Sequence, residues 1–437
     1  MKVAIIGTGH VGLVTAVTLA AIGHDVSGMD ADEEKIEALR QGRAPFFEPG
    51  LQAMLEEQAA AGRLRFSPDP RETLPGAEIV FICVGTPSTP DGEANLAAVE
   101  RSCIEIARHA DAGVVVVGKS TVPAGTADRM RETFRRERPD GRFHLVSNPE
   151  FLREGSAIHD TLEPDRVLVG AEDEAGFDAL RRLYAPLLDR GVPLIETDVS
   201  TAELAKHASN AFLALKISYV NALARLCERV GADVTAVTNV MGSDPRIGGA
   251  FLRAGIGYGG HCFPKDVAAF GRLADRLGYP FPILAEIARI NDEAVEAVVE
   301  LVRDAVWNVP GKRIAILGLS FKPETDDIRL SPALALAARL LELGAEVAGY
   351  DPRAAANAKA EVPDLVIAPD PYAAAEGAHA IVLATEWSEL VELDPGRLRA
   401  AVAQPVLIDA RNALDGAAFA EAGFEYRPIG RPALRPD

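Results

Sequence analysis

The chain has 437 residues, 48% of them hydrophobic, and is therefore long enough for two or three globular domains rather than a single core. Its formal net charge of −19 argues against general binding to nucleic acid or to an anionic membrane, and no uninterrupted apolar stretch is long enough to span a bilayer. The four cysteines lie far apart without paired metal-ligand spacing, so we expect free thiols, no metal site and a cytoplasmic location.

The N-terminal region has the pattern of a dinucleotide-binding fold. The predicted elements are a strand over 2–6, a glycine-rich turn over 7–12, a helix over 13–22 and a second strand over 25–29. In this pattern Gly7 makes a tight turn, Gly9 lets the backbone approach a pyrophosphate, and Gly12 lets the helix pack closely on the strand. Asp30 follows the second strand, where a carboxylate can bind a ribose hydroxyl. The alternative is a glycine-rich turn that binds nothing. Because the first strand begins at Lys2, we expect no targeting peptide.

Three further strands each end in a polar turn. They are predicted over 78–83, 113–117 and 143–147. In an open parallel sheet such turns gather at the carboxyl ends of the strands, where ligands bind. We therefore expect Thr86, Thr121, Asn148 and Glu150 to line one crevice, although each of these residue types is also ordinary in turns.

A long helix is predicted over 201–230, and Gly231 ends it. A helix of this length suits a spine between two domains or a dimer interface. Glu203, Lys206 and Asn210 are spaced so that they share one face of the helix. Lys206 is then either a solvated helix lysine or a cation beside a reacting oxygen.

Beyond residue 302 the alternation of strands and helices begins again. Strands are predicted over 312–317, 346–350, 378–384 and 405–409, and a helix is predicted over 332–343. This second unit lacks the Gly-x-Gly-x-x-Gly signature. The expected fold class is α/β, with two Rossmann-like doubly wound domains joined by a central helical domain that contains one long helix. The expected domains are residues 1–196, 197–302 and 303–437.

A glycine-rich loop over 255–266 contains the cysteine with the clearest chemical potential. Cys262 follows four glycines and His261, and Lys265 and Asp266 come shortly after it. A thiol becomes a nucleophile when nearby positive charge stabilises its thiolate. The alternative is a structural cysteine in a flexible turn, and this loop alone does not decide between the two.

Over nearly its whole length the chain resembles the UDP-glucose 6-dehydrogenases, within the larger family of nucleotide-sugar 6-dehydrogenases. The matching segments are the N-terminal glycine turn, Ser-Thr-Val-Pro at 120–123, Asn-Pro-Glu-Phe-Leu-Arg-Glu-Gly at 148–155, Glu-Leu-Ala-Lys at 203–206, Asn-Ala-Phe-Leu-Ala at 210–214, Lys-Ile-Ser at 216–218, the cysteine loop and Gly-Leu-Ser-Phe-Lys at 318–322. The resemblance implies an NAD-binding domain, a helical centre that forms a homodimer, and a C-terminal domain that helps to bind the UDP-sugar.

The resemblance also implies a four-electron oxidation of UDP-glucose to UDP-glucuronate, with two NAD⁺ reduced. Cys262 would add to an intermediate aldehyde as a thiolate, and the thiohemiacetal would be oxidised to a thioester that water hydrolyses. Lys206 would stabilise negative charge on the C6 oxygen, with Asn210 as a hydrogen-bond donor. The other implied catalytic residues are Asp266 and Thr121, which would hold a reacting water, and Glu150, which would act as a general base.

Ligand contacts are likewise implied by the resemblance, residue by residue. The implied NAD contacts are Gly7, Gly9, Val11, Gly12, Asp30, Lys35, Thr86, Thr121, Glu154, Lys265 and Arg329. The implied UDP-sugar contacts are Glu150, Phe151, Leu152, Arg153, Glu154, Lys206, Asn210, Arg246, Phe251, Gly259, Phe321, Lys322 and Arg411. The cations in the second set supply positive charge for a diphosphate. Arg246 is also a candidate for reaching the site of a partner subunit.

One position departs from the pattern of the UDP-glucose enzymes, which usually have serine before the cysteine. Here the residue is His261, and histidine occurs there in relatives that oxidise N-acetylated aminosugars. His261 either fills space or alters the thiol and the acceptor pocket. The segment 244–248, with Tyr258 and Phe263, favours UDP-glucose; GDP-mannose and UDP-N-acetyl sugars remain alternatives. From other classes, a nonenzymatic NAD-dependent sensor and a two-electron 3-hydroxyacid dehydrogenase would need no cysteine nucleophile.

Overall fold

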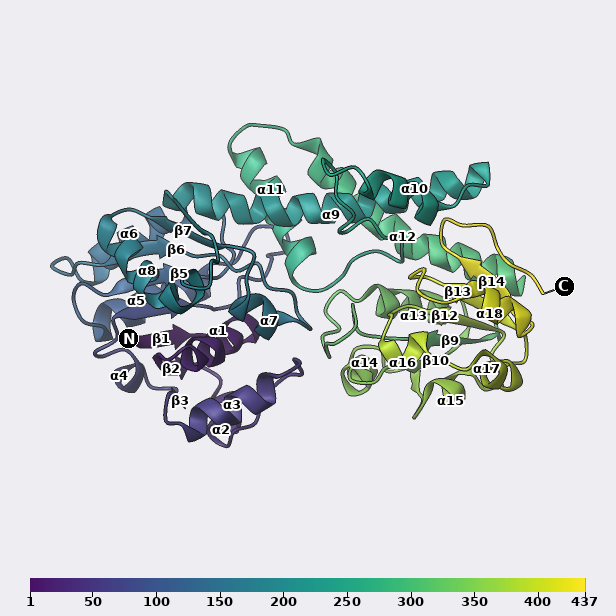
Figure 1. Cartoon of the computed structure of the whole chain (residues 1–437), viewed down its shortest axis with the longest axis horizontal. Helices are drawn as coiled ribbons and strands as arrows, with labels where there is room; N and C mark the ends of the chain where they lie inside the picture. The colour runs from purple at the N-terminus through teal and green to yellow at the C-terminus, as the bar shows by residue number, and fades with distance from the viewer. Residues whose placement is uncertain (437) are drawn as a thin grey trace. The chain divides into compact units, whose positions relative to one another are not determined.

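The structure is a computed structural model that describes residues 1–436 (Figure 1). The chain divides into two compact units, each built on one β-sheet. Unit 1 contains residues 1–209 and 268–279, and unit 2 contains residues 210–267 and the chain from 280 onward. The boundary at residue 209 lies within α9 (Val199–Val230), which Figure 1 shows as one unbroken helix.

The sheet of unit 1 has eight strands in the spatial order β3-β2-β1-β4-β5-β6-β7-β8. Their bounds are β1 (Lys2–Ile6), β2 (Asp25–Met29), β3 (Leu64–Phe66), β4 (Ile79–Ile82), β5 (Val115–Gly118), β6 (His144–Ser147), β7 (Val167–Ala171) and β8 (Leu194–Thr197). In the central register, Ile5 lies between Gly28 of β2 and Phe81 of β4. All neighbouring strands of this sheet pair parallel except β6 and β7, which pair antiparallel, with Ser147 opposite Gly170.

Both faces of this sheet are covered by core side chains. Along β1, Val3 and Ile5 belong to one buried cluster, whereas Ala4 and Ile6 belong to another. Successive side chains of a strand point to opposite faces, so the two clusters lie on the two sides of the sheet. Burial on both faces explains why the strands read as continuous apolar runs.

The helices of unit 1 pack around its sheet, and the glycine turn lies between β1 and the first of them. They are α1 (His10–Ala21), α2 (Glu33–Arg40), α3 (Leu51–Ala60), α4 (Pro70–Thr73), α5 (Ala97–His109), α6 (Thr126–Glu137), α7 (Ala157–Leu162), α8 (Glu174–Leu188) and the later part of α11 (Cys262–Arg276). The predicted start of α1 was three residues late, because Gly9 is the N-cap and the helix begins at His10. A β-carbon on Gly12 would lie 1.8 Å from the carbonyl oxygen of Gly7, so the close approach of α1 to β1 requires glycine there.

The sheet of unit 2 has six parallel strands in the order β11-β10-β9-β12-β13-β14. Their bounds are β9 (Arg313–Leu317), β10 (Glu346–Tyr350), β11 (Val366–Ile367), β12 (Ala380–Leu383), β13 (Val406–Asp409) and β14 (Glu425–Pro428). When the strands of this unit are numbered from 1 to 6 in chain order, their order across the sheet is 3-2-1-4-5-6. This is the strand order of a doubly wound Rossmann fold. The expected second Rossmann-like sheet is therefore confirmed.

Helices of different lengths belong to unit 2 together with this sheet. Besides part of α9, the helices are α10 (Val234–Gly242), α12 (Pro282–Val306), α13 (Pro332–Glu342), α14 (Ala355–Glu361), α15 (Pro371–Ala375), α16 (Ser388–Val391), α17 (Pro395–Ala401) and α18 (Gly416–Glu421). Val220 and Ala224 of α9, Val298 and Val302 of α12, and Ile316 of β9 belong to one buried cluster. The second half of α9 is thus part of the hydrophobic core of this unit.

The other predicted elements differ from the observed bounds by at most two residues at either end. Strands β3, β7, β8, β11 and β14 were not predicted. The division into three domains stays a prediction; its boundary at residue 302 lies inside α12, and its last residue, Asp437, lies outside the described residues. Within residues 1–436, no helix combines the length and the apolar character needed to cross a membrane.

Candidate active site

The glycine turn of unit 1 and the end of β2 form the predicted dinucleotide site. The Asp30 carboxylate accepts hydrogen bonds from the backbone N–H of Thr8 at 2.8 Å and from Lys35 Nζ at 3.0 Å. Burial opposes ionisation of Asp30, but the hydrogen bonds from Thr8 and Lys35 outweigh it and hold the pKa below its usual value. A β-carbon added to Gly9 would meet no atom within 4 Å, so this position leaves room for a ligand. The residues present therefore fit a dinucleotide, with an ionised acid where its ribose would lie.

The turns after β4, β5 and β6 only partly form the predicted crevice. Thr86 Oγ1 donates to the carbonyl oxygen of Thr121 at 2.9 Å, so these two turns are in contact. Asn148 does not line a crevice, because its amide is buried and donates to the carbonyl oxygen of Leu168, while its side-chain oxygen accepts from Lys119. That part of the prediction was wrong: the polar side chain at the end of β6 satisfies buried backbone instead.

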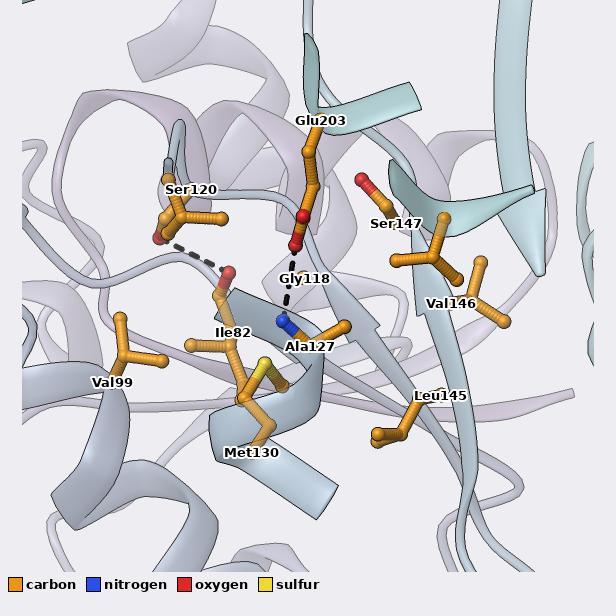
Figure 2. A pocket seen from close by; sticks show the side chains of 12 residues that line it. Ile82, Val99, Gly118, Ser120, Ala127, Met130, Leu145, Val146, Ser147 and Glu203 are labelled. Atoms are coloured by element: carbon orange, nitrogen blue, oxygen red, sulfur yellow. Dashed lines mark hydrogen bonds between the residues drawn. The ribbon is translucent and has the colours of Figure 1, made fainter. Parts of the chain in front are cut away.

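Glu203 of α9 binds the N-terminus of α6, just beyond the Thr121 turn. Its carboxylate accepts from the backbone N–H of Gly125 at 2.8 Å and of Ala127 at 3.2 Å. Figure 2 shows the second of these bonds beside a small cavity of about 20 Å³ that Glu203 lines. Burial raises the pKa of Glu203 to about 7, although the two N–H donors lower it. One turn further along α9, His207 contacts the carbonyl oxygen of Val122 at 2.9 Å.

Lys206 and Glu150 form a buried ion pair within unit 1. Lys206 Nζ lies 3.0 Å from Glu150 Oε1, and the two side chains are only 4% and 8% exposed. Lys206 Nζ also lies 5.2 Å from the ring centroid of Phe151, while Arg166 stacks on this ring at 3.9 Å. The other Glu150 oxygen accepts from the backbone N–H of Leu152 at 2.9 Å. Lys206 is therefore not a solvated helix lysine; it is a buried cation held beside a carboxylate.

Asn210, four residues after Lys206 on α9, belongs to a second buried polar group, in unit 2. Its Nδ2 donates to Asp266 Oδ2 at 2.6 Å, and Lys265 Nζ donates to Asp266 Oδ1 at 2.6 Å. Asp266 is fully buried. Both oxygens of this carboxylate are thus held in place, so three residues predicted from sequence lie in direct contact.

The glycine loop that leads to Cys262 is anchored on the C-terminal sheet of unit 2. The backbone of Ile256 donates to Ala410, and that of Gly260 donates to Arg329. A β-carbon on Gly259 would lie 2.2 Å from the carbonyl oxygen of Leu330, so the loop backbone passes directly over this segment. The glycines of this loop therefore let its backbone pack closely against protein.

Arg411, which lies two residues beyond the end of β13, contacts the same loop. Its guanidinium donates to the backbone carbonyl oxygens of Ala384 at 2.7 Å and of Gly257 and Phe321 at 3.2 Å each. Its side chain is only 13% exposed. This cation lies beside the loop, and much of its hydrogen-bonding capacity serves the backbone.

Cys262 is the first residue of α11 and the one exposed cysteine among the residues described. The N-terminus of a helix favours a negative charge, which suits a thiolate. Burial raises the pKa of Cys83 and of Cys103 to about 12, so these thiols are inert. Burial also lowers the pKa of His261, and the cations of Arg329 and Lys265 add to this effect, so His261 is a neutral imidazole near pH 7.

Three predicted arginines are paired with nearby aspartates at the surface. Arg153 binds Asp160, Arg246 binds Asp244 and Arg329 binds Asp327, each through two guanidinium nitrogens. The Arg246 side chain is 86% exposed. The remaining predicted contacts, Val11, Glu154, Phe251 and Lys322, are each partly exposed.

The second sheet carries a counterpart of Asp30 that sequence reasoning missed. Asp351 follows β10 and accepts from the backbone N–H groups of Leu319 and Ser320. The indole N–H of Trp387 also donates to it, and Asp351 is 2% exposed. The missed signal was Tyr-Asp-Pro after the second strand of the unit, which parallels Met-Asp-Ala after β2. Trp387 therefore covers Asp351, whereas the corresponding carboxylate of the first sheet, Asp30, is placed to contact a ribose.

Three family models match consecutive parts of the chain. Residues 1–188 match the NAD binding domain, residues 200–293 the central domain and residues 315–416 the UDP binding domain of the UDP-glucose/GDP-mannose dehydrogenase family. The UDP-glucose 6-dehydrogenase of Rhizobium meliloti is 44% identical over 99% of this chain and 100% of its own length. The UDP-glucose 6-dehydrogenase of Pseudomonas aeruginosa is 42% identical over 99% of this chain and 98% of its own length.

Solved structures agree over the whole length. A UDP-glucose dehydrogenase from Pyrobaculum islandicum is 36% identical, with a TM-score of 0.91 over 99% of this chain and 98% of that one. A UDP-D-ManNAc dehydrogenase from Pyrococcus horikoshii is 28% identical, with a TM-score of 0.87 over 99% of both chains. The fold is thus common to relatives named for different sugars.

Proposed function

Because the chain belongs to the UDP-glucose/GDP-mannose dehydrogenase family, we propose that it oxidises UDP-glucose to UDP-glucuronate. It is an NAD-dependent oxidoreductase. The observation that carries the proposed chemistry is the exposed Cys262 at the start of α11, followed one turn later by Asp266 in its bonds to Lys265 and Asn210. A nonenzymatic sensor would have no use for this combination of nucleophile and buried polar groups.

NAD would be held by the glycine turn and by Asp30, with Lys35 and Thr86 nearby in unit 1. When bound there, NAD⁺ supplies the hydride acceptor, and two successive transfers take a C6 alcohol to the oxidation level of a carboxylate. Helix α1 begins at His10, and the partial positive charge at its N-terminus would stabilise the negative charge of the pyrophosphate. The remaining cofactor contacts proposed are Val11, Thr121, Glu154, Lys265 and Arg329.

Cys262 would provide the covalent step. Its Sγ adds to the C6 carbonyl carbon of the aldehyde, and the carbonyl oxygen takes up a proton to give a thiohemiacetal. After oxidation to a thioester, water attacks the same carbon and the C–S bond breaks, which returns the thiolate and leaves the carboxylate. Covalent capture also prevents loss of the reactive aldehyde between the two oxidations.

The two buried polar groups would control charge and protons. Lys206 would stabilise negative charge on the C6 oxygen, and Asn210 would donate a hydrogen bond to it. Glu150, already 3.0 Å from Lys206, would accept a proton from the hydrolytic water. Asp266 and Thr121 would hold the water that takes part in proton transfer. Preorganisation by fixed contacts lets such groups act without rearranging during the reaction.

The UDP-sugar would be bound mainly by two segments. The loop after β6 contributes Phe151, Leu152, Arg153 and Glu154, and the C-terminal sheet contributes Phe321, Lys322 and Arg411. Further proposed contacts are Arg246, Phe251 and Gly259. Lys322 and Arg411 supply positive charge for the diphosphate in a chain whose net charge is −19.

We also propose that the protein is a cytoplasmic homodimer. Phe212, Tyr219 and Leu226 of α9 are 61%, 54% and 56% exposed and are spaced seven residues apart. Residues seven apart lie on one face of a helix, so they form an apolar stripe of the kind that pairs with a second copy. The four cysteines lie far apart in the sequence, a usage that is typical of a reducing compartment.

A second candidate substrate is a UDP-N-acetyl-hexosamine. Two observations favour it: His261 beside the nucleophile, and the full-length likeness to the UDP-D-ManNAc dehydrogenase. The test is to measure kcat/KM for NADH formation with UDP-glucose, UDP-N-acetylmannosamine, UDP-N-acetylgalactosamine and GDP-mannose. We expect UDP-glucose to exceed the others at least about tenfold, since pocket contacts that reject an added group discriminate by that order. A higher kcat/KM for an N-acetyl sugar would overturn the assignment to UDP-glucose.

A further inference from the structure

Glu48 is a buried carboxylate that the proposed mechanism does not use. It precedes Pro49 and Gly50 in the connection between α2 and α3, and its side chain has no exposed surface. Burying an ionisable group in this way is costly unless each oxygen has a partner. The partners of Glu48 come from two segments that are far apart in the sequence.

One partner is the first residue of α1. His10 Nε2 lies 3.0 Å from Glu48 Oε2, and the imidazole ring stacks on Phe46 with 4.6 Å between centroids. His10 directly follows Gly9 in the turn that holds the pyrophosphate of NAD. The orientation of this turn is therefore fixed by a contact with the 46–48 segment.

The other partners lie at the end of the loop that follows β6. The backbone N–H of Gly155 donates to Glu48 Oε2 and that of Ala157 to Oε1, both at 2.7 Å. The same loop carries Glu150, the partner of Lys206, five residues before Gly155. Hydrogen bonds this short to a buried carboxylate are among the stronger ones in proteins.

We propose that Glu48 is a positioning residue that holds the NAD-binding turn and the substrate-binding loop in one fixed arrangement, so that binding of either ligand favours binding of the other. The role of the loop in binding the sugar rests on the proposed function above. A single carboxylate bridges the two segments, so a ligand that orders one of them reduces the conformational freedom left in the other. The coupling is reciprocal, as any binding linkage must be.

The test is Glu48→Gln, which keeps the size of the side chain but replaces one acceptor oxygen with a donor. In either orientation, the amide NH2 group then faces a backbone N–H, that of Ala157 or that of Gly155. The dissociation constant of NADH is measured by fluorescence titration, with and without saturating UDP-glucuronate. In the wild type we expect UDP-glucuronate to tighten NADH binding severalfold. In Glu48→Gln we expect NADH alone to bind about tenfold more weakly, the effect of one lost hydrogen bond to a charged group, and the tightening to fall towards onefold.

A second variant separates the two halves of the bridge. His10→Phe retains an aromatic ring beside Phe46 but removes the contact with Glu48. It should weaken NADH binding and abolish the coupling while leaving the affinity for UDP-glucuronate alone unchanged. The matched control is Asp173→Asn, because Asp173 also contacts a histidine, His144, and caps a helix, but away from the site. This control should retain both the affinity and the coupling.

The proposal is overturned if the two ligands bind independently in the wild type, or if Glu48→Gln keeps wild-type coupling. A destabilised variant is recognised by its thermal unfolding midpoint, and His10→Phe then carries the test. Failure of the proposed function can be distinguished from failure of the coupling. If the wild type does not oxidise UDP-glucose, titration with NADH and the nucleotide UDP still measures coupling between the turn and the loop.

Discussion

At the level of single residues, the proposed role of each side chain depends on how deeply it is buried. Lys206 and Asp266 are buried and have partners at 3.0 and 2.6 Å, so their charges are fixed in position. Cys262 is exposed at the start of a helix, where a nucleophile remains accessible and a thiolate is favoured. Within unit 2, the fixed carboxylate of Asp266 follows the accessible thiol by one helical turn, an arrangement that suits covalent oxidation of an aldehyde.

Replacement of Cys262 should uncouple binding from turnover. Cys262→Ser keeps the size of the side chain, but a hydroxyl ionises far less readily than a thiol. We expect kcat to fall by at least about a hundredfold, with the affinities for NAD and UDP-glucose within about twofold of wild type. Cys103→Ala, at a buried thiol, is the control and should retain turnover. Steady-state NADH formation and calorimetric binding check both; a fully active Cys262→Ser would return Cys262 to a structural role.

Asp30 should determine the preference for NAD⁺ over NADP⁺. Its carboxylate would repel a 2′-phosphate, so wild-type kcat/KM should favour NAD⁺ at least about tenfold. Asp30→Ser leaves Lys35 without its carboxylate partner and able to attract that phosphate, so the preference should shrink or reverse. Asp32→Asn, at the neighbouring N-cap of α2, should leave the preference unchanged. Equal use of both cofactors by the wild type would contradict the role assigned to Asp30.

At the level of elements, α9 connects most of the proposed chemistry. Glu203, Lys206 and Asn210 follow one another along a single face and bind three different segments: the start of α6, the loop after β6 and the start of α11. Glu203 is the one member of this row that does not touch a proposed ligand.

The raised pKa of Glu203 predicts a pH-dependent stability that one substitution should remove. The folded state binds the proton of Glu203 up to about pH 7, whereas the unfolded chain releases it near pH 4.5. The contribution is thus fully present below pH 4.5 and is lost as the pH rises through 7, with a span of at most about 3 kcal/mol. Glu203→Gln stays neutral, so its unfolding temperature relative to wild type should rise between pH 5 and pH 8. A difference that does not change with pH would contradict the raised pKa.

Elements with a regular pattern were predictable from sequence, and contacts between distant segments were not. The strands at 2–6 and 25–29 and the long helix were found because their apolar runs are bounded by glycine or aspartate. The start of α1 was misplaced because His10 is polar, although its ring is held inside by Glu48. Asn148 was misassigned because sequence shows that a residue follows a strand but not which way its side chain turns. Glu48 was missed because no local pattern marks a carboxylate whose two backbone partners lie more than a hundred residues away.

At the scale of the whole molecule, the two sheets share one strand order but differ in what their second strand presents to a ligand. Both sheets begin with the order 3-2-1-4-5-6 and have an aspartate after their second strand. Asp30 is accessible enough to meet a ribose, whereas Trp387 covers Asp351. The same topology therefore provides a dinucleotide site once and a packed support for the glycine loop the second time.

The exposed stripe on α9 predicts that the working molecule is a dimer. Tyr219→Glu places a charge in the middle of this stripe, so it should convert a wild-type dimer to a monomer. Arg229→Gln, an exposed position near the end of the same helix, should leave the dimer intact. Light scattering during size exclusion gives the mass of each. A wild-type protein that elutes with the mass of one chain would show that the stripe has another role.

The number of NADH formed per sugar tests the central claim most directly. Purified enzyme is given limiting UDP-glucose and excess NAD⁺, NADH is measured by absorbance, and the product is identified by mass. The account predicts two NADH and one UDP-glucuronate for each UDP-glucose, because Cys262 retains the aldehyde until its second oxidation. One NADH per sugar with release of an aldehyde would contradict the four-electron reaction and the covalent role of Cys262.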